Sequence, residues 1–285
     1  MRILFILLLT VYFNDSLSQS LNVERVRRIK ESTVRIFAGK STGTGFFVDS
    51  SGMCATCLHV VYPAIDSKAK IFIQFSNGEL IEVKKIDFRK VDQTKNEAFY
   101  DYCLLVPIKP LNRKTPFLKI GSYDDVQEGA EIYTCGYPFG SSLQFVTRGI
   151  LSTKYTAPQS IVSSTEIVET RERNQALMDI TLNKGNSGGA IVKVGASMFE
   201  DEIIGIADFI ITPLQYEIDS TIASLSYALG TSVQTIIDSN GRIMSKNDPV
   251  ENAILIYSQL SKFSVGISGC VSVEYLRAVV RVPHE

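Results

Sequence analysis

The chain has 285 residues, of which 45% are hydrophobic and 21% are charged, and its formal net charge is −1. This composition is typical of a globular protein with one large or two small domains. Because there is no basic excess and no charged tail, the sequence gives no indication of a nucleic-acid partner.

Residues 1–18 have the pattern of a secretory signal peptide. Arg2 precedes an apolar run from Ile3 to Phe13, and small and polar residues follow. The run is shorter than the roughly 20 apolar residues that a membrane-spanning helix needs. We expect cleavage near Ser18, a secreted or otherwise extracytosolic protein, and no stable membrane anchor after cleavage. An apolar strand or an uncleaved anchor is the alternative.

The first half of the mature chain reads as short strands after a short amphipathic helix over 21–31. Ser76-Asn77-Gly78 is a strong hairpin signal. Many short strands joined by turns, with little helix, predict an all-β sandwich or barrel. This first set of strands, labelled barrel one, covers about residues 32–112, with strands at 33–37, 45–48, 53–58, 69–75, 79–86 and 99–108.

A second set of strands, labelled barrel two, covers about residues 117–213. The two sets of strands together would form one domain over residues 19–213. Apolar residues at helical spacing from Ser220 to Asp238, followed by Asn240-Gly241, predict a core-packing helix. Residues 214–285 are expected to form a partly helical extension of unassigned role. Strands of barrel two are expected at 131–135, 144–152, 176–182, 190–194 and 202–209.

The organising stretch of the second half is the loop between Asp179 and Val192. Ser187 lies there between glycines, which allow positive φ and close backbone approach. Such a loop can present a serine hydroxyl beside N–H donors aimed at an oxyanion, as acyl transfer requires. A glycine-rich hairpin with an incidental serine is the plainer interpretation.

A serine nucleophile needs a base, and the chain has only two histidines. His284 is one residue from the end of the sequence, so His59, at the end of the predicted strand 53–58, is the candidate. Asp101, at the start of an apolar strand, is the best carboxylate to orient the imidazole. Asp87 and Asp92 are weaker candidates because no apolar strand follows them directly.

Seven stretches in chain order resemble a trypsin-fold serine protease of the HtrA/DegP-like branch, over roughly residues 32–210. The resemblance implies two antiparallel β-barrels and a secreted endopeptidase that cleaves a protein or peptide substrate. The matching stretches are Gly43-Thr-Gly-Phe46, Thr56-Cys-Leu-His59, Asp101-Tyr-Cys-Leu-Leu105, Gly136-Tyr-Pro-Phe-Gly140, Val146-Thr-Arg-Gly-Ile150, Gly185-Asn-Ser-Gly-Gly189 and Ile203-Ile-Gly-Ile206.

The resemblance also assigns roles. It makes His59, Asp101 and Ser187 the catalytic triad, and the N–H groups of Gly185 and Ser187 the oxyanion hole. Thr181 takes the position of the pocket floor; it is not acidic, so a small or medium apolar residue before the scissile bond is expected rather than Arg or Lys. The remaining residues placed against substrate are Ile206 and Ala207.

The sequence departs from the family pattern in three places. Cys54 and Cys57 flank His59, Lys184 replaces a common proline, and nothing after Pro213 resembles a PDZ domain. Asn186 stands where an activated zymogen has an acidic partner for a new N-terminus, so no activating cut of that kind is expected.

Cys54-x-x-Cys57-x-His59 invites a metal interpretation. Structural zinc needs four ligands and no second pair follows, so we expect packed or disulfide-bonded cysteines, no metal and no cofactor. The five cysteines (Cys54, Cys57, Cys103, Cys135 and Cys270) leave the disulfide pairing open, and the oligomeric state is open as well.

Two further functions remain as alternatives. Gly185-Asn-Ser187-Gly-Gly189 also fits the nucleophile elbow of an α/β-hydrolase, but that motif needs a following helix and a later histidine. A catalytically inactive protease-fold binding protein is the second alternative.

Overall fold

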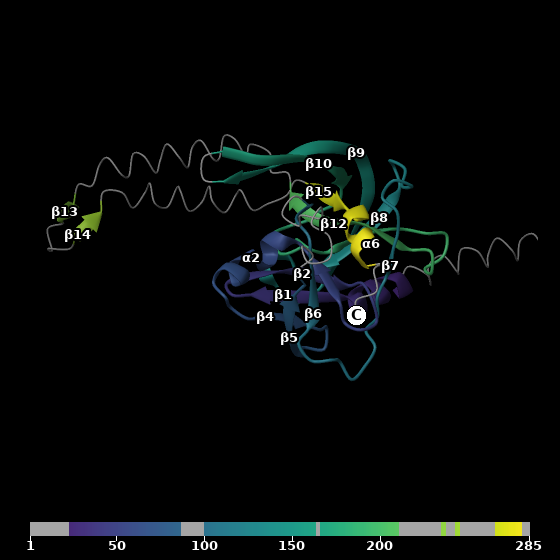
Figure 1. Cartoon of the computed structure of the whole chain (residues 1–285), viewed down its shortest axis with the longest axis horizontal. Helices are drawn as coiled ribbons and strands as arrows, with labels where there is room; N and C mark the ends of the chain where they lie inside the picture. The colour runs from purple at the N-terminus through teal and green to yellow at the C-terminus, as the bar shows by residue number, and fades with distance from the viewer. Residues whose placement is uncertain are drawn as a thin grey trace, which may run out of the picture.

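The computed structural model describes residues 23–86, 100–163, 166–210, 235–237, 243–245 and 266–280. Two groups of antiparallel strands pack against each other, one drawn in purple to blue and the other in teal to yellow (Figure 1). The predicted N-terminal helix is present over 23–32. No helix in the described ranges is long and apolar enough to cross a membrane. The predicted signal peptide, residues 1–18, lies outside the described residues.

Barrel one is a closed ring of six strands in the order β1-β2-β3-β6-β5-β4. Its strands alternate between core and surface: on β1, Val34, Ile36 and Ala38 are fully buried. The predicted Asn-Gly hairpin joins β4 to β5, with Gly78 at a φ of 87°. Its strands are β1 (Thr33–Ala38), β2 (Ser41–Phe47), β3 (Cys54–Thr56), β4 (Ile71–Gln74), β5 (Leu80–Lys85) and β6 (Cys103–Pro107).

Barrel two is a sheet in the order β11-β8-β9-β10-β15-β12-β7, and a further β11–β12 pairing closes six of its strands into a ring. The short β7 pairs with β12 in parallel at the edge. The prediction of two β-barrels is therefore confirmed. Its strands are β7 (Lys119–Ile120), β8 (Glu131–Gly136), β9 (Phe145–Ser163), β10 (Glu166–Asp179), β11 (Ala190–Lys193), β12 (Glu202–Ile210) and β15 (Ile267–Ser272).

The predicted boundary at residue 213 differs from the structure. Strand β15 comes from the predicted extension 214–285, yet it pairs with both β10 and β12 and so completes barrel two. Its Cys270 and Val271 are buried in the core. The stretch Ile267-Ser-Gly-Cys-Val-Ser272 has no clear alternation and lies far from β12 in the sequence, so the sequence interpretation left it unassigned.

The predicted helix over Ser220–Asp238 is wrong at its end. Residues of β13 (Thr235–Ile237) pair antiparallel with β14 (Ile243–Ser245). The sequence between these strands contains Asn240-Gly241, which is a hairpin signal as well as a helix stop, and β-branched residues before it favour the strand. The remainder of the predicted helix lies outside the described residues.

The position of β15 in barrel two can be tested with a substitution at Gly269. A Cβ added there would overlap the ring of Phe209 on the neighbouring β12. We therefore expect Gly269→Ala to lower the free energy of unfolding by about 1–3 kcal/mol, the usual cost of overpacking, measured by urea denaturation. In a Phe209→Ala background the same substitution should cost much less. Equal costs in the two backgrounds would place β15 elsewhere.

Candidate active site

His59 lies at the start of a helix and not at the end of a strand, which corrects the sequence-based expectation. Strand β3 ends at Thr56, Cys57 is extended, and α2 (Leu58–Asp66) begins at the next residue. The β-branched run after His59 resembles a strand, but its residues are buried at helical spacing, because α2 packs against β1 and β2 through Val60, Val61 and Ala64.

Asp101 holds both the backbone and the ring of His59. Its Oδ2 lies 2.5 Å from His59 Nδ1, and its Oδ1 accepts a hydrogen bond of 2.9 Å from the His59 backbone N–H. The Asp101 carbonyl accepts another bond, of 3.2 Å, from the N–H of Leu58. A carboxylate on Nδ1 fixes the proton there, so Nε2 is the basic nitrogen of the neutral ring.

Asp101 itself sits in a turn that the C-terminal segment braces. It has a φ of 47°, in the left-handed region that a non-glycine residue adopts only when its surroundings hold it there. On one side of it, the Tyr100 ring stacks on Tyr275 of α6 (Glu274–Val280), with centroids 3.7 Å apart. On the other side, the Tyr102 hydroxyl donates to the Tyr275 carbonyl at 3.3 Å. Helix α6 therefore positions the candidate triad acid.

Ser187 lies on the loop between β10 and β11, and two glycines shape that loop. Gly185 and Gly188 have φ values of 102° and 87°, and a Cβ at either position would overlap neighbouring backbone. The Lys184 carbonyl accepts a 2.5 Å bond from the N–H of Phe139. Since the C=O and N–H of a trans peptide point in opposite directions, the Gly185 N–H points away from that contact. Within the described ranges, neither the Gly185 nor the Ser187 N–H donates a hydrogen bond.

The nucleophile loop lies against the segment that precedes His59. The Gly188 backbone approaches Thr56 and Cys57 so closely that a Cβ would overlap them, and its N–H donates to the Ala207 carbonyl at 2.8 Å. Ser187 is half-buried. The Ser187 hydroxyl makes no hydrogen bond with His59 within the described residues. The structure thus joins His59 to Asp101 directly and places the loop of Ser187 against the residues that precede His59, without the final hydrogen bond, a common feature of unliganded sites.

Thr44 of barrel one fixes this loop of barrel two, and the sequence interpretation assigned it no role. It is fully buried, and its N–H donates to the Ser187 carbonyl at 2.9 Å. Its hydroxyl donates to the Gly185 carbonyl at 2.6 Å and accepts from the Tyr137 N–H at 3.1 Å. Its position in the Gly43-Thr-Gly45 stretch was the available signal, because flanking glycines permit close approach of another backbone.

A family model of the trypsin-like peptidase domain matches residues 43–198, which is more than half of the chain. The chain belongs to this family. It is 28% identical over 204 residues to the probable periplasmic serine endoprotease DegP-like of Rickettsia conorii, covering 71% of this chain and 34% of that protein. It is 30% identical over 167 residues to serine protease HTRA1 of Xenopus tropicalis, covering 58% and 31%. The chain spans about a third of the length of these curated relatives.

Solved structures show the same fold. The HtrA-type protease AlgW with tripeptide superimposes with a TM-score of 0.54 at 18% identity, covering 91% of this chain and 62% of that one. An inactive Ser343Ala mutant of Rv3671c from M. tuberculosis H37Rv gives a TM-score of 0.51 at 16% identity, covering 67% and 80%. At these identities the likeness concerns the two-barrel architecture, which agrees with the sheet order observed here.

In this trypsin-like peptidase a second carboxyl, Asp208, lies beside the His59–Asp101 pair. Asp208 Oδ1 is 3.9 Å from His59 Nδ1, and its Oδ2 is 3.1 Å from Nη2 of Arg173. A carboxylate oxygen of Asp208 also lies within 4.8 Å of one of Asp101. The sequence interpretation named neither Asp208 nor Arg173. A carboxyl group inside the apolar run of β12 was the available signal for Asp208, whereas Arg173 lies in a polar stretch of β10 that gave none.

The protonation equilibria of the pair follow from these contacts. Burial disfavours the charged ring of His59, but the hydrogen bond and charge of Asp101, with the charge of Asp208, outweigh it and raise the His59 pKa. Burial favours the neutral form of Asp101, but the hydrogen bond from His59 and the charge of the ring hold its pKa below the usual value. The two groups therefore form an ion pair whenever His59 is protonated.

Four potential metal-binding atoms meet at this point: Cys57 Sγ, His59 Nδ1 and carboxylate oxygens of Asp101 and Asp208 lie within 4.8 Å of one another. Each already has a protein partner, since the Cys57 thiol donates to the Ala207 carbonyl at 3.2 Å and the others bond as described above. The Arg173 guanidinium also opposes a cation there. We therefore interpret the cluster as a hydrogen-bond network.

All five cysteines are buried, and none of them forms a disulfide with another described residue. Burial raises the pKa of each thiol for which a shift is resolved (Cys54, Cys57, Cys135 and Cys270). A thiol that stays protonated and inaccessible is unreactive, so a role in redox chemistry is disfavoured.

The predicted specificity residues fall in different environments. Thr181 is exposed, so a pocket that it lines is open to water. Ile206 and Ala207 are each only 1% exposed, and Ala207 contacts the nucleophile loop through backbone bonds to Gly188 and Gly189. These two residues therefore fix the position of β12 beside Ser187.

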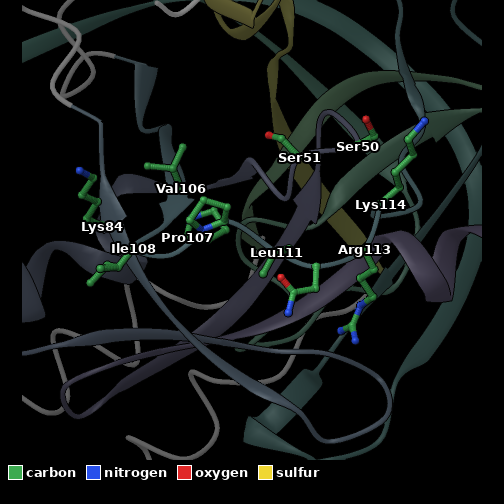
Figure 2. A pocket seen from close by; sticks show the side chains of 11 residues that line it. Ser50, Ser51, Lys84, Val106, Pro107, Ile108, Leu111, Arg113 and Lys114 are labelled. Carbon is green, nitrogen blue, oxygen red and sulfur yellow. The ribbon is translucent and has the colours of Figure 1, made fainter.

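A hollow of about 740 Å³ lies between β6 and the connection after it, and Figure 2 shows its lining side chains. Lys84, Arg113 and Lys114 give it a basic character beside the apolar Val106 and Ile108. No triad residue lines it, so it takes no part in the candidate chemistry.

The role of the Thr44 hydroxyl can be tested by removing it. Thr44→Val keeps the shape of the side chain but leaves the Gly185 carbonyl and the Tyr137 N–H without their partner. We expect the free energy of unfolding to fall by about 1–3 kcal/mol, the cost of leaving buried polar groups unpaired, in urea denaturation. Thr44→Ser, which keeps the hydroxyl, is the matched control. A loss as large in the serine variant would assign the effect to packing instead.

The choice of Asp101 as partner of His59 predicts a pH effect. Asp101→Asn removes the negative charge that stabilises the imidazolium, so the titration midpoint of His59 should fall by about 1–3 pH units. The chain has only two histidines, so proton NMR of the imidazole resonances can follow His59 directly. Asp92→Asn, which removes a weaker candidate of the same region of the sequence, should leave the midpoint in place. The reverse result would make Asp92 the partner.

Proposed function

We propose that this trypsin-like peptidase is a serine endopeptidase that hydrolyses protein or peptide substrates through His59, Asp101 and Ser187. The single observation that carries the proposal is the contact of Asp101 with both the ring and the backbone of His59, beside a glycine-shaped loop that bears Ser187. A carboxylate–imidazole pair next to an accessible hydroxyl is the arrangement that activates serine for acyl transfer.

In the proposed mechanism, His59 Nε2 removes the proton of Ser187 as the hydroxyl attacks the substrate carbonyl. Asp101 keeps the other ring proton on Nδ1 and stabilises the imidazolium that forms. His59 then gives the proton to the leaving amine, and water hydrolyses the acyl-enzyme by the same steps in reverse order. The raised pKa of His59 makes it a stronger base but requires a higher pH for the base to be free.

The N–H groups of Gly185 and Ser187 form the proposed oxyanion hole. Both lack a hydrogen-bond partner within the described part of the chain, and the Gly185 N–H is turned away from the Lys184–Phe139 contact. Such preorganised donors stabilise the negative oxygen of the tetrahedral intermediate, and loss of one typically slows turnover by about 10²–10³-fold.

For substrate recognition, we propose that Thr181 contacts the residue next to the scissile bond and that the buried Ile206 and Ala207 hold β12 beside it. Because Thr181 is uncharged, the preference is for a small or medium apolar side chain rather than for Arg or Lys. The position of β12 beside Ser187 supports this assignment, since the backbone of Ala207 is bonded to the nucleophile loop.

The proposed location is secreted or otherwise extracytosolic. It rests on the signal-like pattern of residues 1–18 and on relatives that are named periplasmic. Buried thiols with raised pKa values are compatible with an oxidising compartment, because they are protected from oxidants.

The test is covalent labelling with a fluorophosphonate probe, which reacts with activated serines. We expect the parent protein to be labelled, and Ser187→Ala and His59→Ala to lose labelling, since removal of either residue lowers turnover by about 10⁶-fold in a comparable triad. Ser51→Ala, at an exposed serine outside the site, is the matched control. Urea denaturation of each variant separates loss of reactivity from loss of fold.

Absence of labelling in a folded parent protein would contradict the proposal and favour the inactive binding protein. Labelling that survives in Ser187→Ala would place the reactive serine elsewhere in the chain.

A further inference from the structure

Asp208 owes its position to an irregularity in β12. The register between β12 and β15 shifts between Ala207 and Phe209, which makes Asp208 the extra residue of a β-bulge. Bulges turn a side chain out of the normal alternation and are common beside active sites. Here the bulge buries the Asp208 side chain to 9% exposure at the His59–Asp101 pair.

The position of Asp208 favours a protonated carboxyl group. Both oxygens of Asp101 already accept hydrogen bonds from His59, and an ionised carboxylate has no donor of its own. Carboxylate oxygens of Asp101 and Asp208 lie within 4.8 Å of each other, so the two groups repel unless one of them is protonated. Because Asp101 is the partner of the His59 ring, the proton belongs on Asp208, from which it can be donated to Asp101 while the other oxygen of Asp208 faces Arg173.

We propose that Asp208 is a positioning residue of the triad: protonated, it donates a hydrogen bond to Asp101, and ionised, it adds a second negative charge beside His59. The titration of Asp208 thereby sets the pH range in which His59 is free to act as a base. This inference rests on the proposed function for its consequence in catalysis, but the coupling itself is a property of the three side chains.

Among the titratable groups around this site, Asp208 and His59 are the two that change charge near neutral pH. It is faced by Asp101, by Arg173 on β10 and by His59 on α2. Burial and the neighbouring Asp101 carboxylate raise the pKa of Asp208 to about 7. The remaining groups are Cys57, Tyr155 on β9 and Cys270 on β15. Each is neutral near neutral pH, because burial raises its pKa.

The sign of the coupling follows from charge. Below its pKa, Asp208 is neutral and has little effect on the His59 ring. As the pH rises, Asp208 ionises and its negative charge 3.9 Å from Nδ1 stabilises the imidazolium, so His59 releases its proton at a higher pH. Arg173 partly offsets this charge, since it lies on the opposite side of the carboxyl.

The experiment is a histidine titration by NMR on the full chain in a Ser187→Ala background, which prevents self-cleavage. His284→Ala assigns the two imidazole resonances. Asp208→Asn keeps a donor toward Asp101 but cannot ionise, so we expect the His59 midpoint to fall by about one pH unit. Glu172→Gln is the matched control: it neutralises an exposed carboxylate on β10, next to Arg173, and should leave the midpoint unchanged.

Asp208→Ser is the second variant, because the serine hydroxyl can also donate a hydrogen bond to Asp101 without ionising. It replaces Asp208→Asn if the asparagine amide disturbs the fold. A fall in both variants supports the proposal. A His59 midpoint equal to that of the parent in a folded Asp208 variant overturns it, as does an equal fall in Glu172→Gln.

This readout needs no reactive serine, so its failure is distinct from failure of the proposed endopeptidase function. If the parent is labelled by fluorophosphonate, the acidic limb of its labelling rate should move to lower pH in Asp208→Asn, by the same amount as the NMR midpoint.

Discussion

Thr44 joins the two barrels at the loop that carries Ser187, and the geometry of the site depends on this join. Each barrel has its own closed ring of strands, so nothing in the barrels' own pairing fixes one relative to the other. The buried Thr44 hydroxyl and N–H bind three backbone groups of barrel two, at Gly185, Ser187 and Tyr137. Since a buried polar group without a partner is costly, the barrels are held in the one arrangement that satisfies all three. That arrangement brings His59 of barrel one beside the nucleophile loop.

The C-terminal segment provides the second constraint. Strand β15 lies between β10 and β12 and pairs with both. It therefore links the strand that holds Arg173 to the strand that holds Asp208. Helix α6 follows directly, and its Tyr275 contacts residues on both sides of Asp101. The left-handed turn at Asp101 is thus stabilised by packing contributed late in the chain. The site is assembled from barrel one, barrel two and the segment after them, which explains why its parts are far apart in sequence.

The sequence predicts the two barrels and the candidate triad, but not the way they are connected. Short strands and glycine-bounded motifs are local signals, and they are enough to predict the strands of both barrels and to single out His59, Asp101 and Ser187 as candidates. The helix at His59 was missed because β-branched residues such as Val60 favour strands until tertiary packing decides otherwise. Strand β15 was missed because pairing across a long intervening segment leaves no periodic trace. Asp208 depends on a bulge, and a one-residue register shift cannot be read from a pattern of period two.

The charges of the site show why a second carboxyl is tolerated beneath the imidazole. With His59 neutral and Asp208 protonated, the Asp101 carboxylate is balanced by the Arg173 guanidinium. When His59 takes up a proton in the proposed reaction, the cluster becomes neutral again if Asp208 gives one up. Unbalanced buried charge is strongly unfavourable, so a cluster that can remain neutral in both states lowers the cost of forming the imidazolium. The bulge in β12 and the ion pair with Arg173 therefore have a common effect. Together they place one exchangeable proton, on Asp208, next to the Asp101 carboxylate that contacts His59.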